Sequence, residues 1–199
     1  MEFKDLVART RSYRRFDQSV TIPQETLESW VALARIVPSS ANLQALKFLV
    51  VNDQELNALV FKSISFAGYL KEWGGPKEGE KPTAYVLILG DTTIKQNFDL
   101  DTGIAAQTIM LAANEAGFGG VMMAAIKRDA LREDLQIPVH FELVLLLALG
   151  KPTEQVIVEE TSEEHDFRYY RDTEDVHHVP KRPLSELIIH PEDLAKSKD

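Results

Sequence analysis

The stretch from Asp99 to Ala116 places the strongest constraint on the fold of this chain. Its side chains are apolar nearly all the way round a helix, which predicts a helix buried on more than one side. Asp99 and Asp101 lie at its positive N-terminal end, and Gly117 is suited to cap its C-terminus. Many residues are small, so the helix can pack closely against neighbours, including a second subunit. The apolar residues are Ile104, Ala105, Ala106, Ile109, Met110, Leu111, Ala112 and Ala113.

Four apolar runs predict the strands that accompany this helix. The run at 143–149 is continuously apolar, which is typical of a central strand covered on both faces. Helices interleaved with strands indicate an α/β or α+β sheet flanked by helices, within a single domain of residues 1–199. The other predicted strands are 46–51, 85–89 and 121–125, and the other predicted helices are 2–10, 24–36, the segment after Asp53, and 128–135.

Two of these helices carry local start signals. Thr21 and Gln24 have the spacing of a capping box, and Pro23 fits the first turn of the helix that follows. Asp53 is expected to cap the next helix through its side chain.

The character of the chain changes after Gly150. Residues 151–183 form an extended polar segment with little periodicity, which is either disordered or wraps across another surface. The aromatic pair in Arg168-Tyr169-Tyr170-Arg171 favours wrapping, because disordered segments are usually poor in aromatics. Residues 184–189 form a last apolar patch, and 190–199 are expected to be a flexible tail.

Composition excludes several classes of protein. The 22 basic and 31 acidic side chains give a net charge of -9, which argues against general nucleic-acid binding. No apolar run reaches the length of a membrane span, and the N-terminus lacks the core of a signal peptide. The absence of cysteine excludes disulfides, iron–sulfur clusters and a cysteine nucleophile. We therefore expect a cytoplasmic protein that binds a small anion.

Four arginines crowd into seven residues near the start of this acidic chain: Arg9, Arg11, Arg14 and Arg15. The planar guanidinium suits phosphate, since it donates two parallel hydrogen bonds. Hydroxyls of Ser12 and Tyr13 could bond to the same ligand. The alternative is a solvated helix end paired with surface carboxylates. Four arginines exceed the needs of one phosphate, so at least one is expected to pair with an acidic residue.

Two other polar stretches are candidates for ligand binding. The loop 38–44 offers hydroxyl and amide groups that can recognise a polar heterocycle or a ribityl-like chain. The alternative is that its side chains cap a helix and hold a turn. The second stretch is the basic pair Lys181-Arg182. The loop residues concerned are Pro38, Ser39, Ser40, Asn42 and Gln44.

Together these stretches resemble the nitroreductase family of flavin enzymes. Residues 11–16 are similar to its Arg-Ser-x-Arg-x-Phe motif, and 38–44 to its Pro-Ser-x-x-Asn-x-Gln motif. The small-residue helix with Gly117-Phe118-Gly119-Gly120 resembles the family's dimer-core helix and the turn after it. The pair Lys181-Arg182 resembles its late phosphate contact. The resemblance covers about residues 3 to 190, but Thr10 stands where many members have arginine, and Ala45-Leu46 where many have proline and an aromatic.

The resemblance implies an α+β nitroreductase-like fold, with a mainly antiparallel or mixed sheet flanked by helices. It also implies FMN at the interface of a homodimer with shared active sites, and a C-terminal extension that wraps the partner subunit. The implied contacts to phosphate and ribityl are Arg11, Ser12, Tyr13, Arg14, Arg15, Lys181 and Arg182. Those along the flavin are Pro38, Ser39, Ser40, Asn42, Gln44 and the backbone near Gly119 and Gly120.

The activity implied by the resemblance is transfer of two electrons from NAD(P)H, through FMN, to a small electrophilic acceptor such as a nitro compound or quinone. The cofactor carries this chemistry, so no catalytic side chain is assigned. The sequence does not distinguish NADH from NADPH, nor does it identify the acceptor. The same residues would serve a non-catalytic flavin-binding or sensing module. They would also serve a specialised dehalogenase or flavin-fragmenting member, which would differ mainly in lid loops such as 64–82.

A metal site is the remaining alternative that the sequence suggests. Histidines and aspartates gather late in the chain, but adjacent histidines in an acidic loop are usually solvent-exposed, and their spacing matches no helix-borne ligand pair. We therefore expect no metal ion at these residues. We also assign them no role in ligand binding. They are His165, Asp166, Asp175, His177 and His178.

Overall fold

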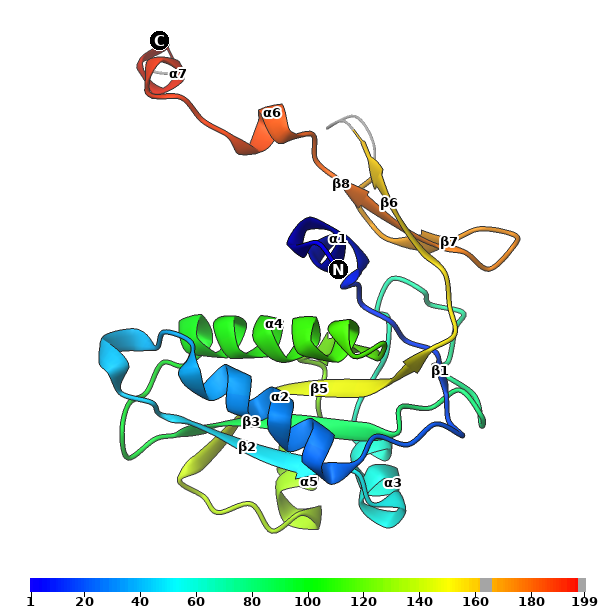
Figure 1. Ribbon diagram of the computed structural model, residues 1–199, viewed down its shortest axis with the longest axis vertical. Helices are drawn as coiled ribbons and strands as arrows, with labels where there is room; N and C mark the ends of the chain where they lie inside the picture. Colours follow the sequence, from blue (N-terminus) through cyan, green and yellow to red (C-terminus); the bar gives the residue numbers. More distant parts are fainter. Residues whose placement is uncertain (162–165, 197–199) are drawn as a thin grey trace. The chain divides into compact units, whose positions relative to one another are not determined.

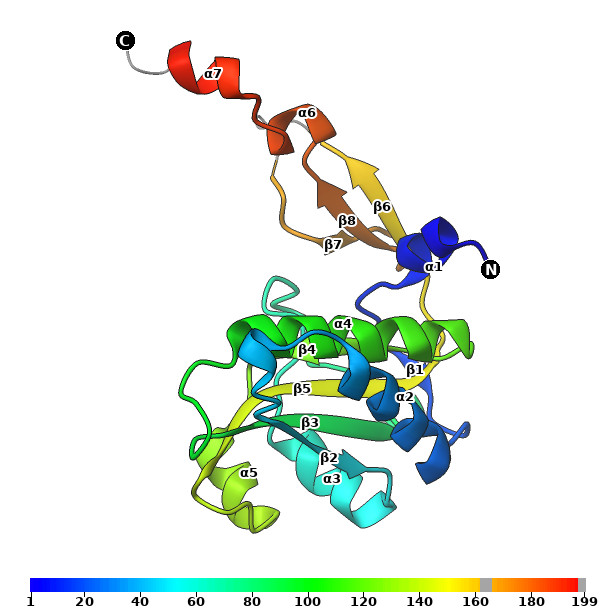
Figure 2. The same cartoon turned by 60° about the vertical axis from the view of Figure 1, so that its left-hand side comes forward.

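The computed structural model describes residues 1–161 and 166–196, and it divides into two compact units (Figures 1 and 2). The first unit contains residues 1–68 and 73–153, and the second contains residues 69–72 and the chain from 154 onward. Among the described residues, no helix is long and apolar enough to cross a membrane.

The first unit is built on a five-stranded antiparallel sheet whose centre is β5 (Phe141–Pro152). One edge of β5 pairs with β3 (Ala84–Asp91), which in turn pairs with β2 (Leu46–Val51). The other edge pairs with β4 (Gly119–Met123) and with the short β1 (Phe16–Asp17). The four predicted strands are confirmed, although β4 begins two residues earlier than expected. The two-residue β1 was not predicted, because it is too short for periodicity.

Helices cover both faces of this sheet (Figure 1). On one face, α2 (Gln24–Ile36) and α4 (Asp99–Glu115) pack against alternate β3 residues such as Val86. On the other face, α3 (Gln54–Lys62) and α5 (Arg128–Asp134) pack against the residues between them, such as Tyr85. Since successive strand residues face opposite sides, the fully buried β3 serves both layers. The N-terminal α1 (Phe3–Arg9) precedes the sheet.

Of the three helix ends for which the sequence predicts a cap, two are capped as expected. The Asp53 carboxylate accepts the backbone N–H groups of Glu55 and Leu56, so the predicted cap of α3 is confirmed. Gly117, with φ of 79°, ends α4 in a Schellman motif, because its N–H bonds to Asn114 O and the N–H of Phe118 bonds to Ala113 O. The capping box predicted before α2 is wrong.

Pro23, not Thr21, stands at the N-cap of α2, and no side chain caps this end. Gln24 instead donates its amide to Glu28, one turn further along the helix. The capping spacing was therefore present in the sequence without the backbone register that a capping box requires.

The second unit contains a small three-stranded sheet in the order β6-β8-β7. β6 (Val156–Glu160) runs parallel to β8 (His177–Lys181), and β7 (Tyr170–Arg171) is antiparallel to β8. A buried ion pair of 2.7 Å joins Arg171 to Glu154. Two short helices follow, α6 (Leu184–Leu187) and α7 (Pro191–Lys196). The strands were not predicted, because most of their residues are not buried and alternation is weak.

His178 connects all parts of this small sheet. Its Nδ1 lies 3.1 Å from Glu159 Oε2 on β6, and its Nε2 lies 3.1 Å from Asp172 Oδ2, just after β7. The Tyr170 ring stacks on the imidazole with ring centroids 4.7 Å apart. Only the protonated imidazolium can donate from both nitrogens. The hydrogen bonds to Asp172 and Glu159 accordingly raise the pKa of His178 above its ordinary value of 6.5.

We expect the second unit to be most stable below pH 6.5 with respect to this group, and to lose the contribution of His178 as the pH rises through the raised pKa. A raised folded-state pKa has this sign because the folded state holds the proton more tightly. An NMR titration of the imidazole Cε1–H, with amide exchange on β6 and β8, measures it. His178→Gln should remove the transition. A wild-type midpoint at or below 6.5 would contradict the expectation.

Candidate functional site

The arginine run lies between α1 and β1 and packs beside the C-terminal end of α4. The Arg9 carbonyl accepts the Tyr13 hydroxyl at 2.9 Å and the Asn114 side-chain amide at 3.2 Å. Thr10 is buried, and its hydroxyl donates to Leu6 O at 2.7 Å, which closes the end of α1.

The four arginines have different surroundings. Arg9 is exposed, whereas Arg14 is only 8% exposed and donates to Ser12 O at 3.1 Å. Arg15 Nε lies 3.8 Å from Glu80 Oε2, which is the kind of acidic partner expected for one member of the run. Arg11 is half-buried and donates through Nη2 to Val7 O at 2.8 Å. Its Nε is buried without a hydrogen-bond partner among the described residues, so it retains a donor for a ligand.

Gly119 and Gly120 lie against the arginine run. Ser12 forms a β-bridge with Gly120, and the Tyr13 N–H donates to Gly120 O at 2.9 Å. A Cβ at Gly119 would lie 2.6 Å from the Tyr13 ring, and a Cβ at Gly120 would lie 2.5 Å from Ala148 O. Within this chain, the missing side chains therefore allow Tyr13 and β5 to approach closely.

The loop 38–44 has an unusual backbone. It contains a 3-10 turn at Ser40–Asn42, and three residues have positive φ: Ala41 at 49°, Asn42 at 54° and Gln44 at 52°. Left-handed residues other than glycine cost roughly 1 kcal/mol or more each. Such a cluster persists only where surrounding contacts hold it, and it is typical of functional loops.

Asp101, in the first turn of α4, holds this loop. Its Oδ1 accepts the Ser40 N–H at 2.8 Å and the Ser40 hydroxyl at 2.7 Å, while its Oδ2 accepts Lys95 Nζ at 2.5 Å. The carboxylate side chain is only 2% exposed. Burial alone would raise the pKa of Asp101, but the hydrogen bonds from Lys95 and Ser40 outweigh burial and hold that pKa below its ordinary value. The group is thus a buried, fully engaged carboxylate.

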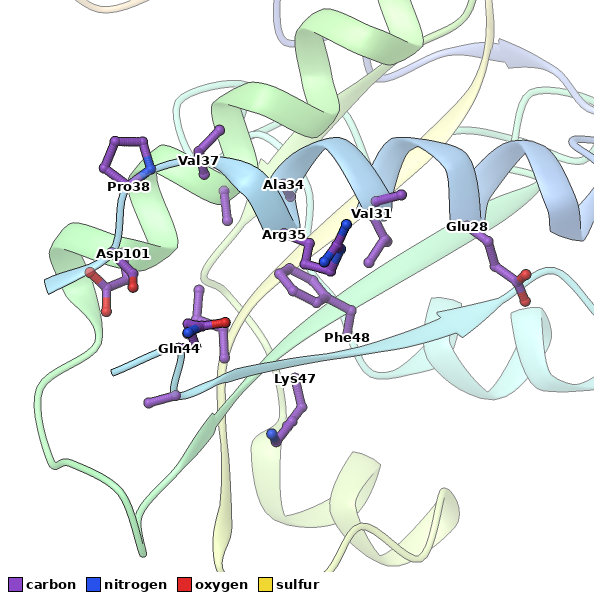
Figure 3. A pocket seen from close by; sticks show the side chains of 15 residues that line it. Glu28, Val31, Ala34, Arg35, Val37, Pro38, Gln44, Lys47, Phe48 and Asp101 are labelled. Carbon is purple, nitrogen blue, oxygen red and sulfur yellow. The ribbon is translucent and has the colours of Figure 1, made fainter. Parts of the chain in front are cut away.

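Beside this loop is a cavity of about 520 Å³ that we call the α2–β2 cavity (Figure 3). Its walls come from α2, β2, the loop itself and the first turns of α4. Ser39 lines it, and the Ser39 hydroxyl is buried without a hydrogen-bond partner among the described residues. The lining residues are Glu28, Val31, Ala32, Ala34, Arg35, Val37, Pro38, Ser39, Gln44, Ala45, Leu46, Lys47, Phe48, Asp101 and Ala105.

Within one chain, the arginine run and the 38–44 loop lie at opposite ends of α4. The run contacts Asn114 and the loop contacts Asp101. These two anchors are thirteen residues apart in one helix, which corresponds to about 20 Å along its axis. The structure thus brings the run together with Gly119 and Gly120, and brings the loop together with Asp101 and Lys95, but does not join the two groups.

The late candidates lie in the second unit. Lys181 is exposed on β8. Arg182 donates to Glu186 at 3.0 Å and lies 4.0 Å from the Phe167 ring centroid. His177 is buried. Asp175 lies 3.7 Å from Arg171, and Asp166 is bonded to Arg168. His165 lies outside the described residues. Across 1–161 and 166–196, no group of three or more histidine or acidic side chains is arranged to hold a metal ion.

Sequence reasoning gave Asp101 only a helix-terminal role and did not select Lys95 or Arg35. No local sequence signal could have predicted that Asp101 holds the 38–44 loop, because its partner Ser40 is 61 residues away in the chain. An acidic residue in the first turn of a helix is common, and the sequence does not say whether it also binds a distant loop.

Known proteins resemble this chain in sequence and fold. A sequence model of the Nitroreductase family matches residues 7–151. A protein of Archaeoglobus fulgidus, provisionally named NADH dehydrogenase/NAD(P)H nitroreductase, is 27% identical over 154 residues, which cover 73% of this chain and 83% of that protein. A nitroreductase family protein of Clostridium difficile 630 has a crystal structure with a TM-score of 0.68 and 23% identity, covering 96% of this chain and 99% of its own.

Iodotyrosine deiodinase bound to FMN and 3-iodo-L-tyrosine is a further structural neighbour. It has a TM-score of 0.63 and 22% identity, and the match covers 76% of this chain and 90% of the deiodinase chain. These likenesses confirm the α+β fold expected from the sequence.

Proposed function

The chain belongs to the nitroreductase family, and from that premise we propose that it is an FMN-dependent oxidoreductase. It passes two electrons from NAD(P)H to a small electrophilic acceptor such as a nitro compound or quinone. The NAD(P)H nitroreductase name of the archaeal relative supports this activity, and the FMN-bound neighbour supports the cofactor.

The separation of the two polar groups along α4 is the observation that carries this proposal. A single subunit holds the arginine run and the 38–44 loop about 20 Å apart, at opposite ends of one helix. A two-fold dimer can bring the run of one subunit to the loop of the other, because both partners present the same surface. Each of two equivalent sites then receives phosphate-binding groups from one chain and flavin contacts from the other.

Exposed apolar side chains support the dimer. Leu100 on α4 is 66% exposed, and Gly103 beside it has nothing within 4 Å of the position of a Cβ. That face of the otherwise buried helix therefore has no cover within its own unit. In the second unit, Leu184, Leu187, Ile188 and Ile189 are all exposed. We propose that this C-terminal extension wraps the partner subunit, in agreement with the family resemblance.

The residues present fit FMN. Arg11 retains a buried donor for a phosphate, next to Ser12, Tyr13, Arg14 and Arg15, and Lys181 and Arg182 are proposed to add positive charge. Ser39 has a buried hydroxyl without a partner, beside Pro38, Ser40, Asn42 and Gln44, which offer donors and acceptors to a flavin edge. When bound, FMN would supply the two-electron chemistry. The chain would bind and orient it, and N–H and cationic groups would stabilise negative charge on the reduced form.

The purified full-length protein tests this function. We expect a yellow dimer whose flavin absorbance bleaches when NADH or NADPH is added without oxygen. Arg11→Ala should weaken FMN binding by about tenfold or more, since a charge-assisted hydrogen bond contributes about 1.5–3 kcal/mol. Arg132→Ala on α5 is the matched control and should bind FMN as the parent does.

Other outcomes of this test have definite meanings. A monomer that stays colourless with added FMN would contradict the proposal as a whole. A yellow dimer that neither nicotinamide bleaches would favour the non-catalytic flavin-binding module. Unchanged FMN affinity in Arg11→Ala would move the phosphate contact to another arginine of the run.

The single domain and the cytoplasmic location expected from the sequence stay predictions.

A further inference from the structure

We propose that the α2–β2 cavity binds a flat apolar organic acid, with the ring or chain inside the cavity and the carboxylate on Arg35. As a statement about the electron acceptor this inference rests on the proposed function, whereas as a statement about binding it depends only on the cavity.

The walls of the cavity are apolar and come from facing elements. Val31, Ala34 and Val37 lie along α2 and at its end, while Phe48 faces them from β2 (Figure 3). Leu46 of β2 also lines the cavity. The volume of about 520 Å³ falls within the range of sites for small organic ligands. An apolar lining of this size with a few polar groups selects a ligand that is largely hydrophobic.

The charges around the cavity favour an anionic group on that ligand. Asp101 is neutralised by Lys95. Glu28 accepts a hydrogen bond from the neutral amide of Gln24 at 2.8 Å and keeps its charge, but it lies about two turns of α2 away from Arg35. Arg35 lines the cavity from α2 and makes no hydrogen bond or ion pair within 1–161 and 166–196. In a chain with net charge -9, a guanidinium left unpaired at an apolar cavity is suited to a carboxylate, which it can bind through two parallel hydrogen bonds.

The position of the cavity connects it to the proposed flavin site. Ser39 and Gln44 line the cavity, and both belong to the loop that is proposed to contact the flavin. An acid held by Arg35 would therefore extend toward the same loop. This arrangement gives the acceptor a chemical class: an unsaturated or aromatic carboxylic acid whose electrophilic end lies away from its carboxylate.

A pair of redox-inert probes tests the binding directly. 2-Naphthoate and 2-naphthamide share one ring system and differ in charge, and their fluorescence reports binding to the full-length protein as purified. We expect the wild type to bind 2-naphthoate about tenfold or more tightly than 2-naphthamide, as one charge-assisted contact implies. Arg35→Gln should abolish this preference and leave binding of 2-naphthamide nearly unchanged.

Two further variants make the result specific. Arg132→Gln removes the same charge from α5, a helix that contributes no residue to the lining of the cavity, and it should keep the preference for the acid. Val31→Phe fills the cavity and should weaken binding of both probes. Circular dichroism checks that each variant is folded. Equal binding of both probes by the wild type, or loss of the preference in Arg132→Gln but not in Arg35→Gln, would overturn the proposal.

The outcome is separable from that of the proposed function. Since the probes accept no electrons, a protein without flavin activity that still prefers 2-naphthoate through Arg35 would uphold the site and remove the oxidoreductase. A protein whose flavin is bleached by NAD(P)H but which binds both probes equally would uphold the oxidoreductase and remove the proposed acid-binding site.

Discussion

Asp101→Ala is expected to lower the free energy of unfolding by about 3–5 kcal/mol, the cost of breaking a buried ion pair from one side. The substitution removes the acceptor of three donors at once: the Ser40 N–H, the Ser40 hydroxyl and the Lys95 ammonium. Lys95 would keep its charge at a site where its side chain is only 14% exposed. Chemical denaturation of the variant and the parent measures the difference.

The pH dependence of stability provides an independent check on Asp101. Its pKa is lowered in the folded state, so its contribution is present above the unfolded value of 3.8 and is lost as the pH falls through the folded pKa. Asp101→Asn should remove this acid transition, and Lys95→Met combined with Asp101→Asn should recover part of the stability, because no buried charge then remains unpaired. A cost below about 1 kcal/mol for Asp101→Ala would show that the loop is held by other contacts.

Gly120→Val is expected to lower the free energy of unfolding of the first unit by about 3 kcal/mol or more, which is the upper end of the range typical of an overpacked core. A Cβ at this position would lie 2.5 Å from the carbonyl oxygen of Ala148 and 2.7 Å from Leu149 Cδ2. Relief therefore requires the β4–β5 backbones to separate, since a carbonyl in a strand cannot rotate away as a side chain can.

The matched control for Gly120 is Gly74→Val. Gly74 has nothing within 4 Å of its Cβ position, so the same added atoms meet open space. We expect thermal unfolding to show a large fall in Tm for Gly120→Val and little change for Gly74→Val. Equal falls in Tm would mean that the cost does not come from the close contact at Gly120, because the reduced backbone freedom of the unfolded chain favours the folded state in both variants.

The helix at Asp99–Glu115 and the central β5 could be predicted because both carry long, uniform apolar patterns. The strands of the second unit could not, since β6 and β7 are short and mostly exposed, and hydrophobic periodicity reports only burial. The capping box before α2 failed for a related reason. A residue spacing records which groups could meet, while the backbone path decides whether they do.

The candidate site shows the same limit at longer range. The polar residues of the 38–44 loop and the arginine run were identifiable by chemical type. Their placement at the two ends of α4 was not, because it depends on contacts of Asp101 and Asn114 with segments 61 and 105 residues away in the chain. The positive φ angles of Ala41, Asn42 and Gln44 were equally hidden, since residues other than glycine rarely adopt them.

The position of β5 at the centre of the sheet has a consequence for biosynthesis. Within the described residues, β1 and β4 have no strand partner other than β5, and β1 pairs with its last residues, Lys151 and Pro152. During translation the chain must therefore carry two unpaired strands until about residue 152 has left the ribosome. The β2–β3 pair can form earlier, but the sheet closes only when its last strand arrives, so assembly depends on contacts that are distant in the chain and correspondingly slow to form.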